Sequence, residues 1–176
     1  MKKLFIFFIA LVLTASVDAQ KNPIDELFDK YSGQDGFTTV YISSRMFSMF
    51  AGIDSSDPEF TDLMQRLKSI RILSVEDTVK YGKLDFHAEL GKKVDYSTYE
   101  DLMLVKSGAK TVRFLVKYNG DRFSELLMVT SGGGGGSSLI SIKGDLDMKN
   151  ITDISKTMGI EDLKAVEKSN PQPRKK

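Results

Sequence analysis

Few side chains in this 176-residue sequence have the chemistry that a catalytic or metal site needs. The chain has no cysteine and a single histidine, His87. Without cysteine there is no thiol nucleophile and no thiolate metal ligand. Catalytic zinc usually takes two or three imidazoles, and a serine nucleophile would depend on His87 while lacking the G-x-S-x-G turn. We therefore expect no catalytic residue, cofactor or metal from these classes, and we interpret His87 as a surface or half-buried residue.

Carboxylates are the remaining candidates for acid-base chemistry. Asp145 and Asp147 flank Leu146 at the end of a predicted strand, and Glu125 lies in the strand before it. A carboxylate pair can hydrolyse a glycosidic bond or help to bind calcium, although the EF-hand spacing is absent here. Asp147 is explained more simply as the cap of a following helix. A carboxylate-dependent hydrolase or carbohydrate-active enzyme stays open as the alternative function.

The glycine run Gly132–Gly136 resembles a phosphate-binding loop only in composition. A P-loop needs a lysine and a serine or threonine after its last glycine and leads into a helix. Here Ser137 and Ser138 follow, and a strand comes next. We predict a hairpin tip, with a ligand-induced lid as the alternative.

The first 19 residues have the pattern of a secretory signal peptide. Lys2 and Lys3 precede the apolar run Leu4–Leu13, and Val17 and Ala19 supply small residues before a cut. We predict cleavage after Ala19 and export to the periplasm or the extracellular space, with a retained N-terminal anchor as the alternative. A lipoprotein would need a cysteine at the cut, and the mature chain is predicted to hold no integral membrane segment.

The charge balance argues against a nucleic-acid partner. The full chain has a formal net charge of +1, and loss of the signal peptide leaves it neutral. Nucleic-acid binders normally carry a basic stripe or a high pI. We predict one domain over residues 20–168, and a disordered basic tail over residues 169–176 because that segment is short, polar and rich in proline.

Periodicity and turn residues predict an α+β fold with a single antiparallel-rich sheet that ends in a four-stranded meander, with helices packed mainly on one face. The predicted helices are a docking helix capped by Asn22-Pro23, a short one from Ser44 to Gly52, one capped by Asp57-Pro58, Lys83–Val94, and one capped by Asp147. The predicted strands are Phe37–Ser43, Ile70–Val75, Tyr99–Lys106, Thr111–Tyr118, Phe123–Ser131 and Ser138–Leu146. In the second helix, Met46, Met49 and Phe50 fit either a binding face or the core, and we predict core packing.

The turn at Asn119-Gly120-Asp121 decides the strand register. A two-residue loop would set Glu125 opposite Phe114 on the apolar face, where a carboxylate is costly to bury. We predict a three-residue loop, which pairs Phe114 with Leu126, Val112 with Met128, and Glu125 with Leu115.

With that register the second face of the sheet is too apolar to be fully solvated. We expect another element of the chain or a partner to cover it. The candidate interaction face consists of Leu115, Phe123, Leu127 and Val129.

Four stretches resemble the Bacteroidetes family catalogued as domain of unknown function 4252. They are Phe37–Ser43, Ile70–Asp77, Tyr99–Met103 and Leu139–Met148. The resemblance covers nearly the whole mature chain and implies a small, exported envelope protein. It implies no catalytic residue and no cofactor, because the family has no established activity. A link to envelope signalling is implied by association only.

These observations favour an exported, non-enzymatic envelope protein that acts as a binding or protein-interaction module. Its expected partner is another envelope protein, and its oligomeric state is left open.

Overall fold

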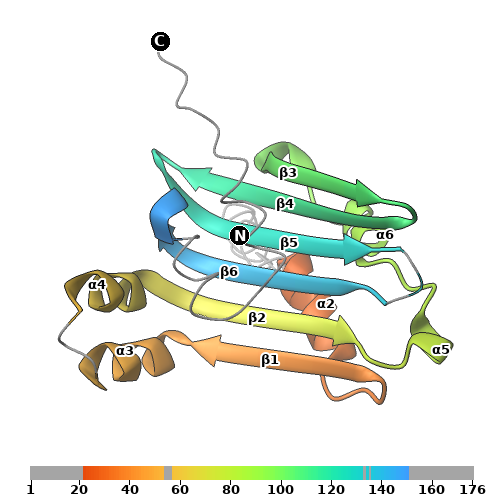
Figure 1. Cartoon of the computed structure of the whole chain (residues 1–176), viewed down its shortest axis with the longest axis horizontal. Coiled ribbons are helices and arrows are strands. Elements are labelled where there is room, and N and C mark those ends of the chain that lie inside the picture. The colour runs from red at the N-terminus through yellow and green to blue at the C-terminus, as the bar shows by residue number, and fades with distance from the viewer. Residues whose placement is uncertain (1–21, 54–56, 133, 135, 151–176) are drawn as a thin grey trace, which may run out of the picture.

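The computed structural model describes residues 22–53, 57–132, 134 and 136–150. Its centre is a six-stranded sheet with the order β1-β2-β6-β5-β4-β3, in which every pair of neighbours is antiparallel (Figure 1). The strands are β1 (Phe37–Ser43), β2 (Leu67–Val75), β3 (Glu100–Ser107), β4 (Lys110–Asn119), β5 (Arg122–Ser131) and β6 (Ser138–Leu146). The meander β3 to β6 and the α+β class are confirmed.

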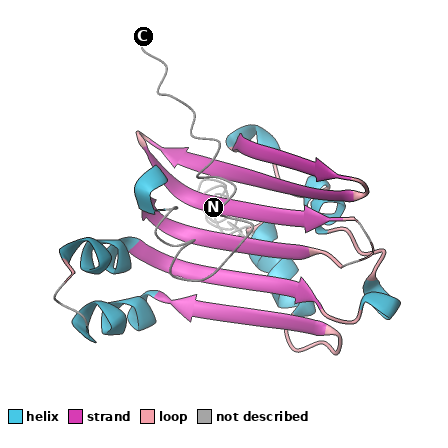
Figure 2. Cartoon of the chain, in the orientation of Figure 1, coloured by secondary structure: helices cyan, strands magenta, loops and turns pink. Residues whose placement is uncertain are grey.

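The helices lie on the sheet and at its ends (Figure 2). They are α2 (Pro23–Tyr31), α3 (Ser44–Ile53), α4 (Pro58–Arg66), α5 (Thr78–Tyr81), α6 (Phe86–Gly91) and the 3-10 turn η1 (Tyr96–Thr98). In Figure 1, α2 and α6 lie behind the sheet, whereas α3 and α4 lie beside its left-hand end.

Polar caps begin the helices where the sequence predicts them. The side chain of Asn22 accepts a hydrogen bond from the backbone N–H of Ile24 at 2.9 Å, and Pro23 opens α2. Asp57 caps α4 by accepting from two backbone N–H groups. Asp147 accepts from the N–H of Asn150 at 2.9 Å, so the predicted cap after β6 is confirmed. The rest of that helix lies outside the described residues.

Two apolar clusters pack against opposite faces of the sheet. One lies under α2 and α6, which we call the α2-side core; its buried members are Ile24, Leu27, Phe28, Tyr31, Leu73, Val75, Phe86, Leu90, Leu115, Leu127, Val129 and Leu139. The other, the α3-side core, joins α3 and α4 to the opposite face and includes Phe47, Leu63, Met64, Ile70, Phe114, Val116, Leu126 and Ile142. Alternate residues of β4 and β5 enter the two cores, as the pleat of a strand requires.

The predicted register of β4 with β5 is wrong. The strands pair as far as Asn119 with Arg122, so the loop is only Gly120-Asp121, and Gly120 takes the positive φ of 64° that such a turn favours. A β-bulge follows at Ser124, which adds one residue to β5. Phe114 therefore pairs with Met128, not with Leu126.

The helical part of residues 83–94 is shorter than predicted. The α-helix begins at Phe86, after the cap Asp85, and ends at Gly91. A four-residue helix, α5, was not predicted; it is capped by Asp77, whose side chain accepts from the N–H of Lys80. Short capped turns of this kind depend on local hydrogen bonds and leave no apolar periodicity to detect.

The predicted signal peptide and the predicted basic tail lie outside the described residues. Among the helices of the described ranges, none has the length and apolar character required to cross a bilayer.

Candidate functional site

Three of the four residues of the predicted interaction face lie in the α2-side core. Leu115, Leu127 and Val129 are at most 1% exposed, beneath side chains of α2 and α6. An element of this chain therefore supplies the cover that the sequence required. The prediction that these side chains meet a partner is corrected, because a side chain without exposed area has no surface to offer.

Phe123 lies on the other face of the sheet. The bulge at Ser124 shifts the alternation of β5 by one residue, so Phe123 joins the α3-side core and packs edge-on against Tyr118, with ring centroids 4.9 Å apart. The four predicted residues thus never formed one surface.

Glu125 is buried, and each of its carboxylate oxygens accepts a hydrogen bond. It is 4% exposed, and it lies opposite Lys117 on β4 and Lys143 on β6. One carboxylate oxygen accepts from the Ser141 hydroxyl at 2.7 Å, and the other from the Tyr99 hydroxyl at 2.8 Å. Two hydroxyl donors and two flanking cations offset the cost of burying a carboxylate.

The phenol of Tyr99 is held in its protonated form. Burial raises the pKa of this phenol far above its usual value, and the negative charge of Glu125 and the hydrogen bond to it raise the pKa further. The Tyr99 hydroxyl therefore keeps its proton at neutral pH and donates a hydrogen bond to Glu125.

A second charged cluster lies beside this pair, at the start of α2. Oδ1 of Asp25 accepts a hydrogen bond from Nζ of Lys143 at 3.1 Å and another from Nη1 of Arg71 at 3.2 Å. The guanidinium of Arg71 also lies over the rings of Phe28 and Tyr41. These contacts tie α2 to β2 and β6, which explains charged residues beneath a helix that is otherwise held by apolar packing.

Asp145 and Asp147 both form ion pairs with Arg122. Arg122 donates to Asp145 at 2.7 Å and lies 3.5 Å from Asp147, and Arg66 lies 3.6 Å from Asp145. Asp147 also caps the following helix. Neither the pocket beside β1 nor the one between α2 and α6 is lined by these carboxylates, and the described part of the chain holds no cluster of three or more metal-ligating side chains. The arrangement favours structural roles for both.

His87 contacts a cation and not a nucleophile. Its Nε2 lies 2.8 Å from Nη1 of Arg113, and its ring stacks on Tyr96. A guanidinium only donates, so Nε2 accepts, and the proton of a neutral ring is on Nδ1. Arg113 also makes a two-point ion pair with Asp101, at 2.5 and 2.9 Å. His87 is half-buried, as predicted.

The Asp101→Asn change is expected to make the fold less sensitive to acid. The hydrogen bond from Arg113 lowers the pKa of Asp101, and the charge of Arg113 adds to this. Ionised Asp101 therefore stabilises the fold above the unfolded-state pKa of about 3.9, and this contribution is lost as pH falls through the lower folded-state pKa. Melting curves recorded from about pH 6 to about pH 2 should show a smaller fall in Tm for the variant than for the wild type.

The matched control for this titration is Asp121→Asn in the exposed turn between β4 and β5. It should follow the wild-type curve. Equal acid slopes for wild type and Asp101→Asn would show that the ion pair contributes nothing measurable.

The described part of the glycine run packs against the fold. Gly132 has a φ of 79°, and a Cβ there would lie 1.9 Å from the carbonyl oxygen of Ala109. Ser137, just after the run, accepts a backbone hydrogen bond from Val75 and donates its hydroxyl to the carbonyl of Leu84. Glycine at position 132 thus allows a close backbone approach, and the described residues form no phosphate cradle.

Helix α3 presents an exposed apolar surface. Met46, Met49, Phe50 and Ile53 are exposed, Met49 by 60% and Ile53 by 78%. We call these four residues the α3 surface. The predicted core packing of its first three members is therefore wrong.

The inward side of α3 is provided by other residues. Phe47 and Ala51, spaced i and i+4, are the buried members. The exposed residues, spaced i, i+3, i+4 and i+7, form a second apolar stripe. Two apolar stripes on one ten-residue helix are the feature of the sequence that could have indicated an exposed apolar surface.

One of three comparisons with known proteins finds a match. No curated protein matches, and no solved structure matches. A family model described as "Domain of unknown function (DUF4252)" matches residues 31–154, which include all six strands. The chain therefore belongs to the DUF4252 family.

Proposed function

We propose that this chain is an exported, non-enzymatic protein-interaction module that binds its partner through the α3 surface. The observation that carries the proposal is the apolar stripe on the solvent side of α3. The apolar stripe of a surface helix normally faces the core, whereas α3 has a second stripe that faces solvent. Methionine and phenylalanine side chains adapt to partner surfaces, and contiguous exposed apolar residues mark interaction sites on soluble proteins.

The charges beside the α3 surface support a protein partner. Arg45 is the only charged residue of α3, so the helix that presents the stripe carries little charge of its own. An apolar centre with few charges is typical of the core of a protein interface. No specific observation favours the hydrolase, because its candidate carboxylates are paired with arginine or buried under hydroxyl donors.

The Met49→Asp variant is expected to lose the partner while it keeps the fold. Met49 is 60% exposed, so a carboxylate there is solvated in the free chain and would be desolvated in the complex. Cross-linking in cells followed by mass spectrometry should recover a partner with the wild type, and recovery should fall at least about tenfold in the variant.

Val79→Asp is the matched control, because Val79 is 99% exposed on α5 and lies outside the α3 surface. This variant should recover the partner as the wild type does. Equal recovery with Met49→Asp and wild type, with melting curves unchanged, would rule out the α3 surface as the binding site.

A further inference from the structure

Strand β1 is an open edge of the sheet, and its composition favours pairing with another strand. Its sequence, FTTVYIS, contains no charged residue and no proline. Its inner side pairs with β2, and in the part of the chain that the structure describes no strand pairs with its outer side (Figure 1). An uncharged segment of this length and β-propensity at an edge is a template for pairing with another chain.

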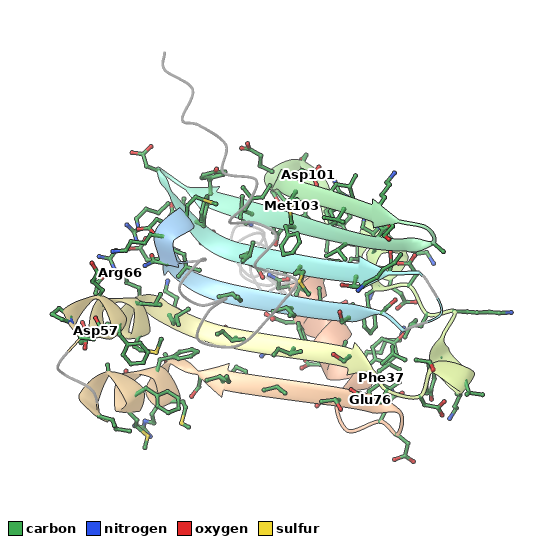
Figure 3. The ribbon with its side chains drawn as sticks, viewed as in Figure 1. Phe37, Asp57, Arg66, Glu76, Asp101 and Met103 are labelled. Carbon is green, nitrogen blue, oxygen red and sulfur yellow. The ribbon has the colours of Figure 1, made fainter. Side chains whose placement is uncertain are left out.

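The opposite edge is protected against such pairing. Strand β3 carries Glu100, Asp101 and Lys106, and its pairing with β4 shifts register between Asp101 and Met103, which Figure 3 labels. Charged side chains and β-bulges both prevent edge-to-edge association. The chain therefore protects one edge and leaves β1, which begins at Phe37, unprotected.

We propose that β1 pairs with the β1 of a second copy of this chain, antiparallel, around a twofold axis beside Val40. In this register Val40 faces the partner's Val40, Thr39 faces the partner's Tyr41, and two sheets join into one. The contact is isologous, so the uncharged strand meets itself without like charges opposite each other.

The charges at the two ends of β1 complement each other in this arrangement. Asp35 lies five residues before Val40 and Arg45 five residues after it, and both are exposed. Antiparallel pairing around Val40 brings Asp35 of each copy to the end where the partner's Arg45 lies. Opposite charges at both ends favour this orientation and register over a parallel one, which would place like charges together.

A cavity beside β1 can receive a side chain of the second copy. It measures about 180 Å³ and is lined by Phe28 of α2, by Ser32 just after that helix, by Thr39 and by Tyr41, which is 61% exposed. About 10 to 15 Å³ suffices for one water, so this cavity has room for a large side chain. The pairing sets the partner's Tyr41 opposite Thr39, on the sheet face where the cavity lies. Pockets for alternate side chains are how strand addition gains specificity.

The first test is the mass of the full chain in solution, as cells process it, measured by sedimentation equilibrium over a range of concentrations. The wild type should associate to a dimer. Val40→Lys places two ammonium groups against each other at the axis and should raise the dissociation constant at least about tenfold. Leu104→Lys is the matched control, because Leu104 is exposed on the other edge strand, and it should dimerise like the wild type.

The second test uses surface charges, which leave the fold intact. Asp35→Arg alone sets arginine against Arg45 at both ends of the pair, and Arg45→Asp alone sets aspartate against Asp35. Each variant should dimerise more weakly than the wild type. An equimolar mixture of the two restores opposite charges at both ends, so it should form a heterodimer of wild-type strength.

Three outcomes would overturn the proposal: a wild type that stays monomeric throughout, a dimer that Val40→Lys leaves unchanged, or charge variants whose mixture is no stronger than either alone. Met49→Asp should dimerise normally, because Met49 lies on α3, six residues beyond the end of β1, and makes no part of the proposed strand pairing. Failure of dimerisation would therefore leave the partner-binding function untouched, and loss of the partner would leave the dimer untouched.

Discussion

Leu127→Asp is expected to unfold the chain. Leu127 is 0% exposed in the α2-side core, between β5 and the helices that cover it. A carboxylate at this position loses the apolar contacts of the leucine and is buried without a partner, which costs several kcal/mol. That is comparable to the whole stability of a domain of this size, which is about 5 to 15 kcal/mol. Circular dichroism and urea unfolding at neutral pH should show a largely unfolded chain.

Two further variants separate burial from interaction. Leu127→Ala should fold but lose about 2 to 5 kcal/mol, because it leaves a cavity in the same core. Val79→Asp, a carboxylate on an exposed apolar position of α5, should unfold at the wild-type urea midpoint. A Leu127→Asp chain with a wild-type midpoint would mean that the helices do not cover this face in solution.

Glu125→Leu is expected to produce the second-largest loss of stability. The change removes the acceptor of both Ser141 and Tyr99. A buried donor left without an acceptor costs about 1 to 3 kcal/mol, and here two hydroxyls lose theirs. The Ser141 hydroxyl bears the larger penalty, since Ser141 is buried whereas Tyr99 is only partly so. Urea unfolding should give a lower midpoint with an unchanged m-value.

The matched control removes the donors as well. In the triple variant Glu125→Leu, Ser141→Ala, Tyr99→Phe no hydroxyl is left unpaired, and replacing all the polar partners together is close to neutral in many proteins. We expect this variant to recover much of the lost stability. If the triple variant is as unstable as Glu125→Leu alone, the cost comes from packing and not from the hydrogen bonds.

The local structure of this protein could be predicted from its amino-acid sequence. The caps Asn22, Asp57 and Asp147 and the ends of β1 were predicted correctly, because each depends on residues a few positions apart. The absence of cysteine, and with it of thiol chemistry, also follows from the sequence alone.

Which apolar residues are covered depends on how the strands and helices pack together. The bulge at Ser124 moved Phe123 to the opposite face and brought Glu125 against Ser141. The choice between turns that differ by one residue depends on packing across the whole sheet, which a pattern within one strand does not contain. Leu127 and Met49 are both apolar and both lie in periodic segments. The sequence pattern does not tell which of the two is covered by a helix of the same chain. Burial depends on contacts between segments far apart in the sequence. For this physical reason the interaction surface was predicted on a face of the sheet, whereas the exposed apolar residues lie on α3.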